Sequence, residues 1–231
     1  MIALLEAAEL HTYYGQSHVL HGVGFSVAAG EMVTLMGRNG MGKTTTIRSV
    51  LGLTPPRTGS VLMRGREVAG WPAWRIAQQG IALVPEGRGI FPTLTLRENL
   101  IVAARPGPWT VERALTLFPR LRERSAHRGS QLSGGEQQML SIARALLTNP
   151  ALIILDGATE GLAPLVRAEI WSALRKLREE GTAALIVDKE VRPLLELGDR
   201  HLIMVKGRIV FSGTSVEWRA RSEENLALLR A

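Results

Sequence analysis

The chain has 231 residues, 45% of them apolar and only 5% aromatic, so it can bury one substantial core packed mainly by aliphatic side chains. Lys and Arg number 28 against 21 Asp and Glu, a formal charge of +7. The basic residues are scattered and no recognised nucleic-acid-binding module appears, so we expect no nucleic-acid partner. The absence of cysteine excludes disulfides and thiolate metal sites.

The sequence contains no segment that is expected to enter a membrane. No apolar run reaches the roughly 20 residues needed to span a bilayer. The first six residues, Met1 to Glu6, carry an acid and no basic residue, unlike the start of a secretory signal peptide. We therefore expect a cytoplasmic chain.

Short apolar runs predict strands that are buried on both faces, as in a parallel sheet. In chain order we expect these strands at 19–27, 33–36, 61–63, 81–84, 151–155, 184–187, 201–205 and 209–211. Helical segments are expected between them, because alternating strands and helices are typical of an α/β layered fold. The stretch from about 92 to 130 lacks clear strand runs and predicts a mainly helical insertion.

Three helices have distinct signals. The first is expected at 43–51. The second has apolar residues at helical spacing, at Met139, Ile142, Ala143 and Leu146. The third places Val166, Ile170, Leu174 and Leu177 on one face, with Pro164 in its first turn and Gly181 at its C-terminal stop.

A phosphate-binding pattern follows the strand at 33–36. The run Gly37-Arg38-Asn39-Gly40-Met41-Gly42-Lys43-Thr44 fits G-x-x-x-x-G-K-[ST] and leads into the helix at 43–51. Glycines let backbone N–H groups face a polyphosphate, and the helix N-terminus adds positive potential. The pattern predicts that Lys43 reaches the β- and γ-phosphates and that the Thr44 hydroxyl is a ligand of Mg²⁺. The alternative is an ordinary glycine-rich turn.

A second glycine-rich run, Leu132-Ser133-Gly134-Gly135-Glu136-Gln137, precedes the helix at 139–146. A serine hydroxyl and glycine backbone just before a helix also suit an anion. Two such sites far apart in one small chain are explained if the second site of each chain completes the first site of a partner in a two-fold pair.

An acid ends the wholly apolar run at 151–155. Asp156, at the carboxyl end of a buried strand beside a phosphate loop, is well placed to hold Mg²⁺ through water. The alternative is an aspartate that caps a helix.

Together these motifs make the chain resemble the ATP-binding subunits of ABC transporters over nearly its whole length, most closely the branched-chain amino acid importer group. Related amide or urea importers are an alternative. The segments that carry the resemblance are Tyr14-Gly15, 37–43, 84–92, 132–138 and 160–164. It implies a P-loop NTPase (RecA-like) core with an antiparallel β subdomain and a helical signature-motif subdomain. The single domain would span 1–231, with 1–91 and 148–231 as the core and about 92–147 as the helical part.

The resemblance also assigns roles. Tyr14 would stack on adenine, or else be a core aromatic; Glu86 would sense Mg²⁺ or the γ-phosphate, or else be a surface acid. Residues 160–163 would run between the two nucleotide sites. The residues implied for ATP are Tyr14, Gly37, Arg38, Asn39, Gly40, Met41, Gly42, Lys43, Thr44 and Thr45; those for Mg²⁺ are Thr44, Asp156 and Glu86; those that clasp the partner's nucleotide are Ser133, Gly134, Gly135 and Glu136.

The chain departs from the family at the catalytic position. The family places a glutamate, the general base for the attacking water, directly after the Walker B aspartate, but this chain has Gly157. Lys189 occupies the switch position, where histidine is common; it would meet a γ-phosphate electrostatically, or else be a solvated lysine. Asp188, Glu190 or Glu86 are the acids considered as replacements for the base. We expect a chain that binds Mg-ATP but hydrolyses it poorly at its own phosphate loop.

The resulting expectation is an energy-coupling subunit, an ABC-type ATPase by family. Its expected partners are a second ATP-binding subunit, transmembrane permease subunits and, indirectly, an extracytoplasmic substrate-binding protein. It would sit on the inner face of the cell membrane and dock through the apolar residues Ile90-Phe91-Pro92 and the helical insertion.

The alternative functions are a regulatory nucleotide-binding subunit and a DNA-maintenance ATPase. The latter class usually has coiled-coil arms, which this chain lacks. A P-loop kinase would not explain the second glycine-rich run.

Overall fold

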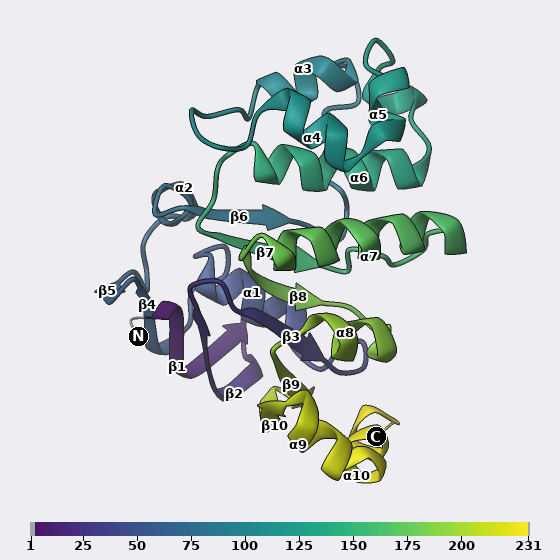
Figure 1. The fold of residues 1–231 in the computed structure, drawn as a ribbon. Coiled ribbons are helices and arrows are strands. Elements are labelled where there is room, and N and C mark those ends of the chain that lie inside the picture. The colour runs from purple at the N-terminus through teal and green to yellow at the C-terminus, as the bar shows by residue number, and fades with distance from the viewer. Residues whose placement is uncertain (1–2, 231) are drawn as a thin grey trace.

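A central six-stranded sheet organises the molecule (Figure 1). The computed structural model describes residues 3–230. The strand order is β10-β9-β3-β8-β7-β6, and all neighbours run parallel except β10, which is antiparallel to β9. The strands are β3 (Met32–Met36), β6 (Ile81–Val84), β7 (Leu152–Asp156), β8 (Ala183–Val187), β9 (Arg200–Val205) and β10 (Arg208–Thr214). Their carboxyl ends form the edge at which α/β folds place ligands.

Apolar side chains cover both faces of this sheet, which is why its strands are unbroken apolar runs in the sequence. In β7, Ile153 and Leu155 join one apolar cluster, whereas Leu152 and Ile154 join another. The first cluster includes helices α6, α7 and α8; the second includes α1 and the antiparallel sheet. These helices are α1 (Lys43–Val50), α6 (Gly134–Leu146), α7 (Pro164–Glu179) and α8 (Val191–Leu197).

The second sheet is antiparallel, has four strands and follows the order β2-β1-β4-β5. Its strands are β1 (Ala3–Tyr14), β2 (Ser17–Ala28), β4 (Thr58–Met63) and β5 (Arg66–Glu67). Strand β1 was not among the predicted strands. Its pairing with β2 shifts register between Ala7 and Leu10, so the alternation of buried side chains is interrupted there. A broken alternation gives no clear strand period in the sequence.

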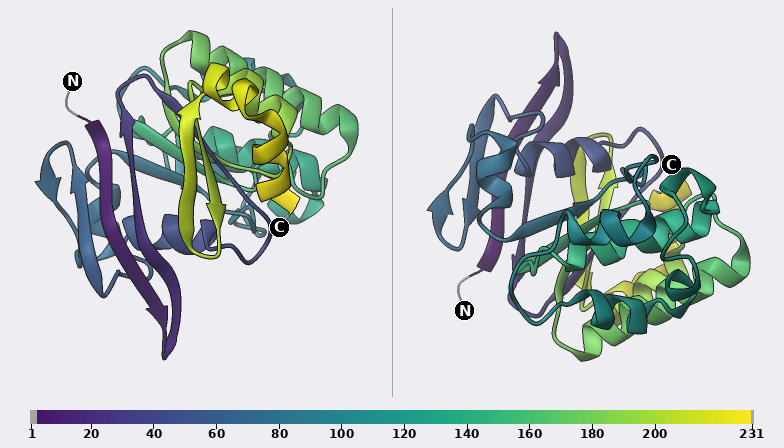
Figure 2. Two further views of the ribbon diagram at one scale, coloured as in Figure 1. Left: turned by 90° about the horizontal axis from the view of Figure 1, so that it is seen from below. Right: turned by 90° about the horizontal axis from the view of Figure 1, so that it is seen from above.

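The predicted helical insertion is a set of short helices packed over α6, on the side of the molecule away from the antiparallel sheet (Figure 2). They are α3 (Leu96–Ile101), α4 (Val111–Leu117), α5 (Pro119–Glu123) and a 3₁₀ turn at Gly129–Gln131. The one departure is an isolated β-bridge between Thr95 and Arg128. The predicted fold class is confirmed: a parallel core, an antiparallel β part and a helical part that bears the second glycine-rich run.

Three further helices are present in residues 3–230: α2 (Ala73–Ala77), α9 (Ser215–Ala220) and α10 (Ser222–Arg230). Helix α2 precedes β6, whereas α9 and α10 follow the β9–β10 hairpin (Figure 1). Over residues 3–230, none of the helices combines the length and the apolar character that crossing a membrane requires.

Candidate functional site

The phosphate loop connects the end of β3 to the start of α1, and its glycines are required by its shape. Gly42 has φ 105°, a backbone region that side chains rarely adopt. A Cβ on Gly37 would lie 2.5 Å from the carbonyl oxygen of Met204, so the loop and β9 could not approach as they do with any larger residue. The sequence pattern therefore reports a real conformational constraint.

The loop is also held from outside. The Gly207 N–H donates to the carbonyl of Met41 at 2.9 Å, and the Lys206 N–H approaches the Met41 sulfur at 3.2 Å. On the other side, the Arg38 guanidinium donates to the carbonyl of Arg230 at 3.0 Å. The β9–β10 hairpin and α10 thus brace the loop, so that its amide groups are fixed before a ligand arrives.

Lys43 lies at the mouth of this loop. Its ammonium group donates to the carbonyls of Gly37 at 2.7 Å and Arg38 at 2.9 Å. Desolvation by burial lowers the pKa of Lys43 below its usual value, while the charges of Glu160 and Asp156 oppose that shift. A cation held among backbone dipoles and acids in this way suits a polyphosphate, whose charge it would share with the loop amides.

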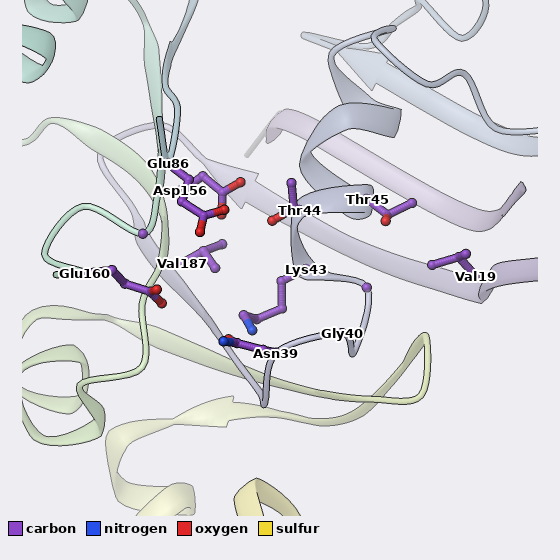
Figure 3. Close-up of a pocket in the computed structure, with 12 residues that line it drawn as sticks. Val19, Asn39, Gly40, Lys43, Thr44, Thr45, Glu86, Asp156, Glu160 and Val187 are labelled. Carbon is purple, nitrogen blue, oxygen red and sulfur yellow. The ribbon is translucent and has the colours of Figure 1, made fainter. Parts of the chain in front are cut away.

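A pocket of about 300 Å³ opens beside Lys43 (Figure 3). The structure brings together nine of the residues expected at the nucleotide: Asn39, Gly40, Gly42, Lys43, Thr44, Thr45, Glu86, Asp156 and Gly157. Val19, Val187 and Glu160 complete the lining. The lining is therefore made by the phosphate loop, by residues at or just after the ends of β6, β7 and β8, and by Val19 of β2.

Thr44, Asp156 and Glu86 form one side of the pocket. Figure 3 shows the side chains of Asp156 and Glu86 next to each other, facing Thr44. Burial raises the pKa of Asp156, a hydrogen bond with Thr44 opposes the rise, and the charge of Glu86 adds to it. Between residues 3 and 230 no three His, Cys, Asp or Glu side chains converge as a complete metal cage. This donor set still fits Mg²⁺, which is usually held by one or two carboxylates together with substrate phosphates.

Gly157 presents no side chain to the pocket. It is buried, its φ is 66°, and its N–H donates to the carbonyl of Val187 at 2.8 Å. Position 157 therefore cannot supply a carboxylate to an attacking water. An ideal Cβ built there would lie 3.5 Å from Cγ of both Glu86 and Glu160.

Two of the acids considered as substitutes are engaged elsewhere. The Asp188 carboxylate is buried and accepts hydrogen bonds from the backbone and hydroxyl of Thr159, at 3.0 and 2.7 Å, and from the Lys189 N–H at 2.7 Å. The Glu190 carboxylate forms an ion pair with Arg167 at 2.7 Å. Neither carboxylate lines the pocket. Both residues had been considered only because they are next to the switch position in the sequence.

Several predicted residues lie outside the pocket lining. Lys189 is exposed and lines a neighbouring hollow together with Gly37, Arg38 and Leu229 of α10. Met41 turns toward the β9–β10 hairpin. These residues shape the surroundings of the phosphate loop rather than the pocket beside Lys43.

Tyr14 stands at the end of β1, beside the start of α1. Its side chain is 47% exposed, which excludes the alternative of an ordinary core aromatic. Partial burial raises the pKa of the phenol, but hydrogen bonds with Thr54 and Thr45 and the charge of Arg48 leave the pKa below its usual value. An exposed ring held next to Thr45 suits stacking against a flat ligand.

The second glycine-rich run begins α6. The Ser133 hydroxyl accepts from the Glu136 N–H at 3.3 Å, and the Ser133 N–H donates to the Glu136 carboxylate at 2.8 Å. Glu136 also pairs with Arg124 at 3.3 Å, so its carboxylate stabilises the helix start. A Cβ on Gly135 would lie 2.5 Å from Val166, so α6 and α7 could not pack as closely with a larger residue. None of these residues lines the pocket beside Lys43.

The loop after β6 links the pocket to this helix start. Its Glu86 lines the pocket, and two residues later the Arg88 guanidinium donates to the side chain of Gln137 at 3.0 Å. The Arg88 carbonyl accepts from the Ser141 hydroxyl at 2.5 Å. The sequence analysis assigned a role to Glu86 but none to Arg88, which it named only as part of the segment 84–92 that carries the resemblance.

Comparison with known proteins agrees with this geometry. The sequence profile described as "ABC transporter" matches residues 20–160. The chain is 40% identical over 219 residues to the high-affinity branched-chain amino acid transport ATP-binding protein BraG of Pseudomonas aeruginosa, covering 91% of this chain and 93% of BraG. It is 33% identical to the probable branched-chain amino acid transport ATP-binding protein LivF of Archaeoglobus fulgidus, covering 93% of each chain.

A solved structure of an ATP-binding subunit of an ABC transporter superposes with a TM-score of 0.85 at 30% identity, covering 99% of this chain and 100% of that one. The sequence profile, the relatives and the solved structure all indicate the same family. The chain therefore belongs to the ABC transporter family and is one of its ATP-binding cassette ATPases.

Proposed function

We propose that the chain binds Mg-ATP in the pocket beside Lys43 and couples that binding to a branched-chain amino acid importer. A bacterial ABC transporter cassette of similar fold has been solved as a dimer, and the relative BraG is an ATP-binding protein of branched-chain amino acid transport. We infer that this chain likewise pairs with a second ATP-binding subunit and works with transmembrane permeases. In the proposed cycle, ATP draws two such subunits together, and hydrolysis and release separate them again. Closure would drive the permease between its inward-open and outward-open states.

One observation carries the proposal. A single pocket gathers the residues suited to a nucleotide's phosphates and its metal, Lys43, Thr44, Asp156 and Glu86, whereas the run Ser133 to Glu136 starts a helix outside that pocket. A nucleotide bound at Lys43 would leave the second run free to meet the nucleotide of a partner subunit. This arrangement supports a two-fold pair with two shared sites.

Thr44, Asp156 and Glu86 are the residues we assign to Mg²⁺. The Thr44 hydroxyl and the Asp156 carboxylate would hold the ion, directly or through water, and Glu86 would complete its surroundings. When bound, Mg²⁺ neutralises phosphate charge. Burial raises the pKa of Asp156 and the charge of Glu86 adds to the rise; a cation between the two carboxylates would relieve their mutual repulsion.

We further propose that hydrolysis at this chain's own pocket is slow. A general base contributes typically about 10²–10⁴-fold to such a step. Gly157 removes that group from the position where the family carries it. The subunit would then hold ATP for longer than a subunit with a glutamate there, and it would still offer its second glycine-rich run to a competent partner.

A regulatory subunit that only holds nucleotide is the second candidate function, and Gly157 is the observation that favours it.

The proposed contact with the permease lies on the helical part. Phe91, Ile101 and Val102 are 47%, 48% and 61% exposed. Ile101 also lines a groove, together with Leu96, Leu100 and Leu115. Apolar surface of this kind suits burial against another protein. The chain would thus act at the inner face of the cell membrane, and an extracytoplasmic binding protein would deliver the substrate to the permease.

Nucleotide binding is tested with the full chain and a Lys43→Ala variant. Removing the ammonium group is expected to raise the Kd for Mg-ATP at least about tenfold, since a hydrogen bond to a charged group contributes about 1.5–3 kcal/mol. Lys176→Ala, on the exposed side of α7, removes the same charge away from the pocket and is the matched control. Equal Kd values for the Lys43→Ala variant and the parent chain would contradict the proposed site.

The transport assignment is tested in cells of the source organism. Deleting the chain is expected to lower uptake of radiolabelled leucine, isoleucine and valine, and restoring it is expected to recover that uptake. Unchanged uptake of these amino acids, with loss of urea or amide uptake instead, would move the subunit to another importer.

A further inference from the structure

The side chain of Glu160 occupies the region into which a side chain at position 157 would point. An ideal Cβ on Gly157 would lie 3.5 Å from Cγ and 3.7 Å from Cδ of Glu160. Glu160 was expected as part of a connecting loop between sites, and no catalytic role was assigned to it. In the structure it lines the pocket, together with Lys43 and Asp156 (Figure 3).

A turn that begins at Gly157 brings Glu160 to this place. The Glu160 N–H donates to the carbonyl of Gly157 at 3.2 Å, and Gly157 has φ 66°, which favours glycine. Between them, Thr159 is anchored to the Asp188 carboxylate by its N–H and its hydroxyl. The glycine that removes one carboxylate therefore also permits the turn that supplies another.

Two acids, the exposed Glu86 and the partly exposed Glu160, flank position 157. They differ in the residues that surround their carboxylates. Figure 3 shows Glu86 beside Asp156 and facing Thr44, whereas Glu160 lies on the side nearer to Lys43. Among the charges that support the pKa of Lys43, that of Glu160 is the largest. Among those that act on the pKa of Asp156, Glu86 precedes Glu160. Glu86 thus lies beside Asp156 and Thr44, the residues assigned to Mg²⁺, whereas Glu160 lies toward Lys43, the residue assigned to the phosphates.

Glu160 is also chemically available. Over residues 3–230 its carboxylate is in no ion pair or hydrogen bond, in contrast to Asp188 and Glu190. A free carboxylate can accept a hydrogen bond from water and then its proton.

We propose that Glu160 orients the attacking water and accepts its proton, in place of the side chain that position 157 lacks. This inference rests on the proposed binding of Mg-ATP. The water oxygen forms a bond to the γ-phosphorus while the bond from that phosphorus to the β–γ bridging oxygen breaks, and its electron pair leaves with ADP. The proton from water goes to Glu160 and later to solvent, so ATP and water yield ADP, inorganic phosphate and a proton.

The same geometry explains why turnover stays below that of a site with a glutamate at position 157. Glu160 is partly exposed, and the next residue, Gly161, has φ 69° and no atom within 4 Å of its Cβ position. A carboxylate on such an open loop is less preorganised than one that directly follows a buried strand. Glu160 therefore carries the residual hydrolysis of this pocket.

The test uses the purified full chain with Mg-ATP and the variants Glu160→Gln and Glu160→Asp. We measure ATP affinity, the single-turnover rate of phosphate release, and the mass of the ATP-bound species by light scattering. Glu160→Gln is expected to slow phosphate release by roughly 10²-fold or more while leaving the Kd for ATP unchanged, so that an ATP-bound dimer persists. Glu160→Asp keeps a carboxylate on a shorter stem and is expected to retain part of the rate.

Glu179→Gln, at the exposed end of α7, removes one negative charge elsewhere and should behave like the parent chain. Phosphate release by Glu160→Gln at the parent rate would overturn the inference. A loss of ATP affinity that accounts for the slower release would overturn it too, because Glu160 would then be a binding residue. Absence of ATP binding by the parent chain would instead refute the proposed function.

Discussion

At the scale of single residues, the pocket is dominated by acids that surround one lysine. Asp156, Glu86 and Glu160 line it together with Lys43, and their charges all raise the pKa of that lysine against the effect of its burial. One ammonium group cannot neutralise three carboxylates. The surplus of negative charge favours a divalent cation on the side of Thr44.

A second buried titratable group makes stability depend on pH. His201 in β9 is fully buried, and its ring nitrogens contact the hydroxyls of Thr34 at 2.8 Å and Ser215 at 2.7 Å. Burial lowers the pKa of His201 from 6.5 to about 4. Between these values the unfolded chain binds a proton that the folded chain does not. The free energy of unfolding should therefore fall as pH drops from about 6.5 to about 4, by about 3 kcal/mol from this residue.

Urea unfolding at a series of pH values checks this expectation against a His201→Asn variant, which keeps a polar side chain but does not titrate. The variant is expected to be less stable at neutral pH and to lose less stability on acidification. If the stabilities of both chains fall in parallel between pH 6.5 and 4, His201 is not the cause. The other histidines are common to both chains and cancel in the comparison.

At the scale of elements, the second glycine-rich run is first of all a helix start. Ser133 and Glu136 form a capping box for α6, a helix that packs against α3, α4, α5 and α7. The shape of the surface proposed to meet the partner's nucleotide therefore depends on the same hydrogen bonds that begin the helix.

Ser133→Ala should lower stability by about 1 kcal/mol, the usual effect of losing an N-cap. Thr110→Ala removes the cap of α4 and serves as the control, because Thr110 accepts from the Arg113 N–H but lies outside the glycine-rich run. Both variants are expected to shift the urea midpoint, and only Ser133→Ala is expected to weaken ATP-dependent dimerisation. Equal dimerisation by the two variants would separate Ser133 from the partner site.

Most elements of the fold could be predicted from the sequence alone. Strands β3, β6, β7 and β8 were predicted nearly to the residue, because burial on both faces leaves an unbroken apolar run. Strand β1 was missed, because its register shifts interrupt the alternation. In the site, the phosphate loop and Asp156 were found through spacing. Glu160 was not, because only the turn at Gly157 shows that a residue three positions later lies beside it.

At the scale of the whole molecule, the two glycine-rich runs belong to different parts of the fold. The phosphate loop lies at the end of β3, whereas the second run begins α6, on the other side of β6 and β7 (Figure 1). The loop from Glu86 to Arg88 contacts both regions, since Glu86 lines the pocket and Arg88 contacts Gln137. A change at the pocket can therefore reach the helical part through a single short loop, which suits a subunit that couples nucleotide state to a permease.

We propose that this pocket holds Mg-ATP and hydrolyses it slowly because position 157 carries no carboxylate. The most direct measurement is single-turnover hydrolysis by the full chain and its Gly157→Glu and Gly157→Ala variants, with ATP affinity measured for each. Both substitutions force a side chain into φ 66°, a strain of about 1–3 kcal/mol, so their comparison isolates the carboxylate.

We expect Gly157→Glu to hydrolyse bound ATP at least about tenfold faster than both the parent chain and Gly157→Ala, because a preorganised general base is restored. The Kd for ATP should be the same for the two variants. A contradictory result would be a hydrolysis rate of the parent chain that is high and equal to that of Gly157→Glu, with ATP bound by all three chains. The missing carboxylate at position 157 would then not limit hydrolysis.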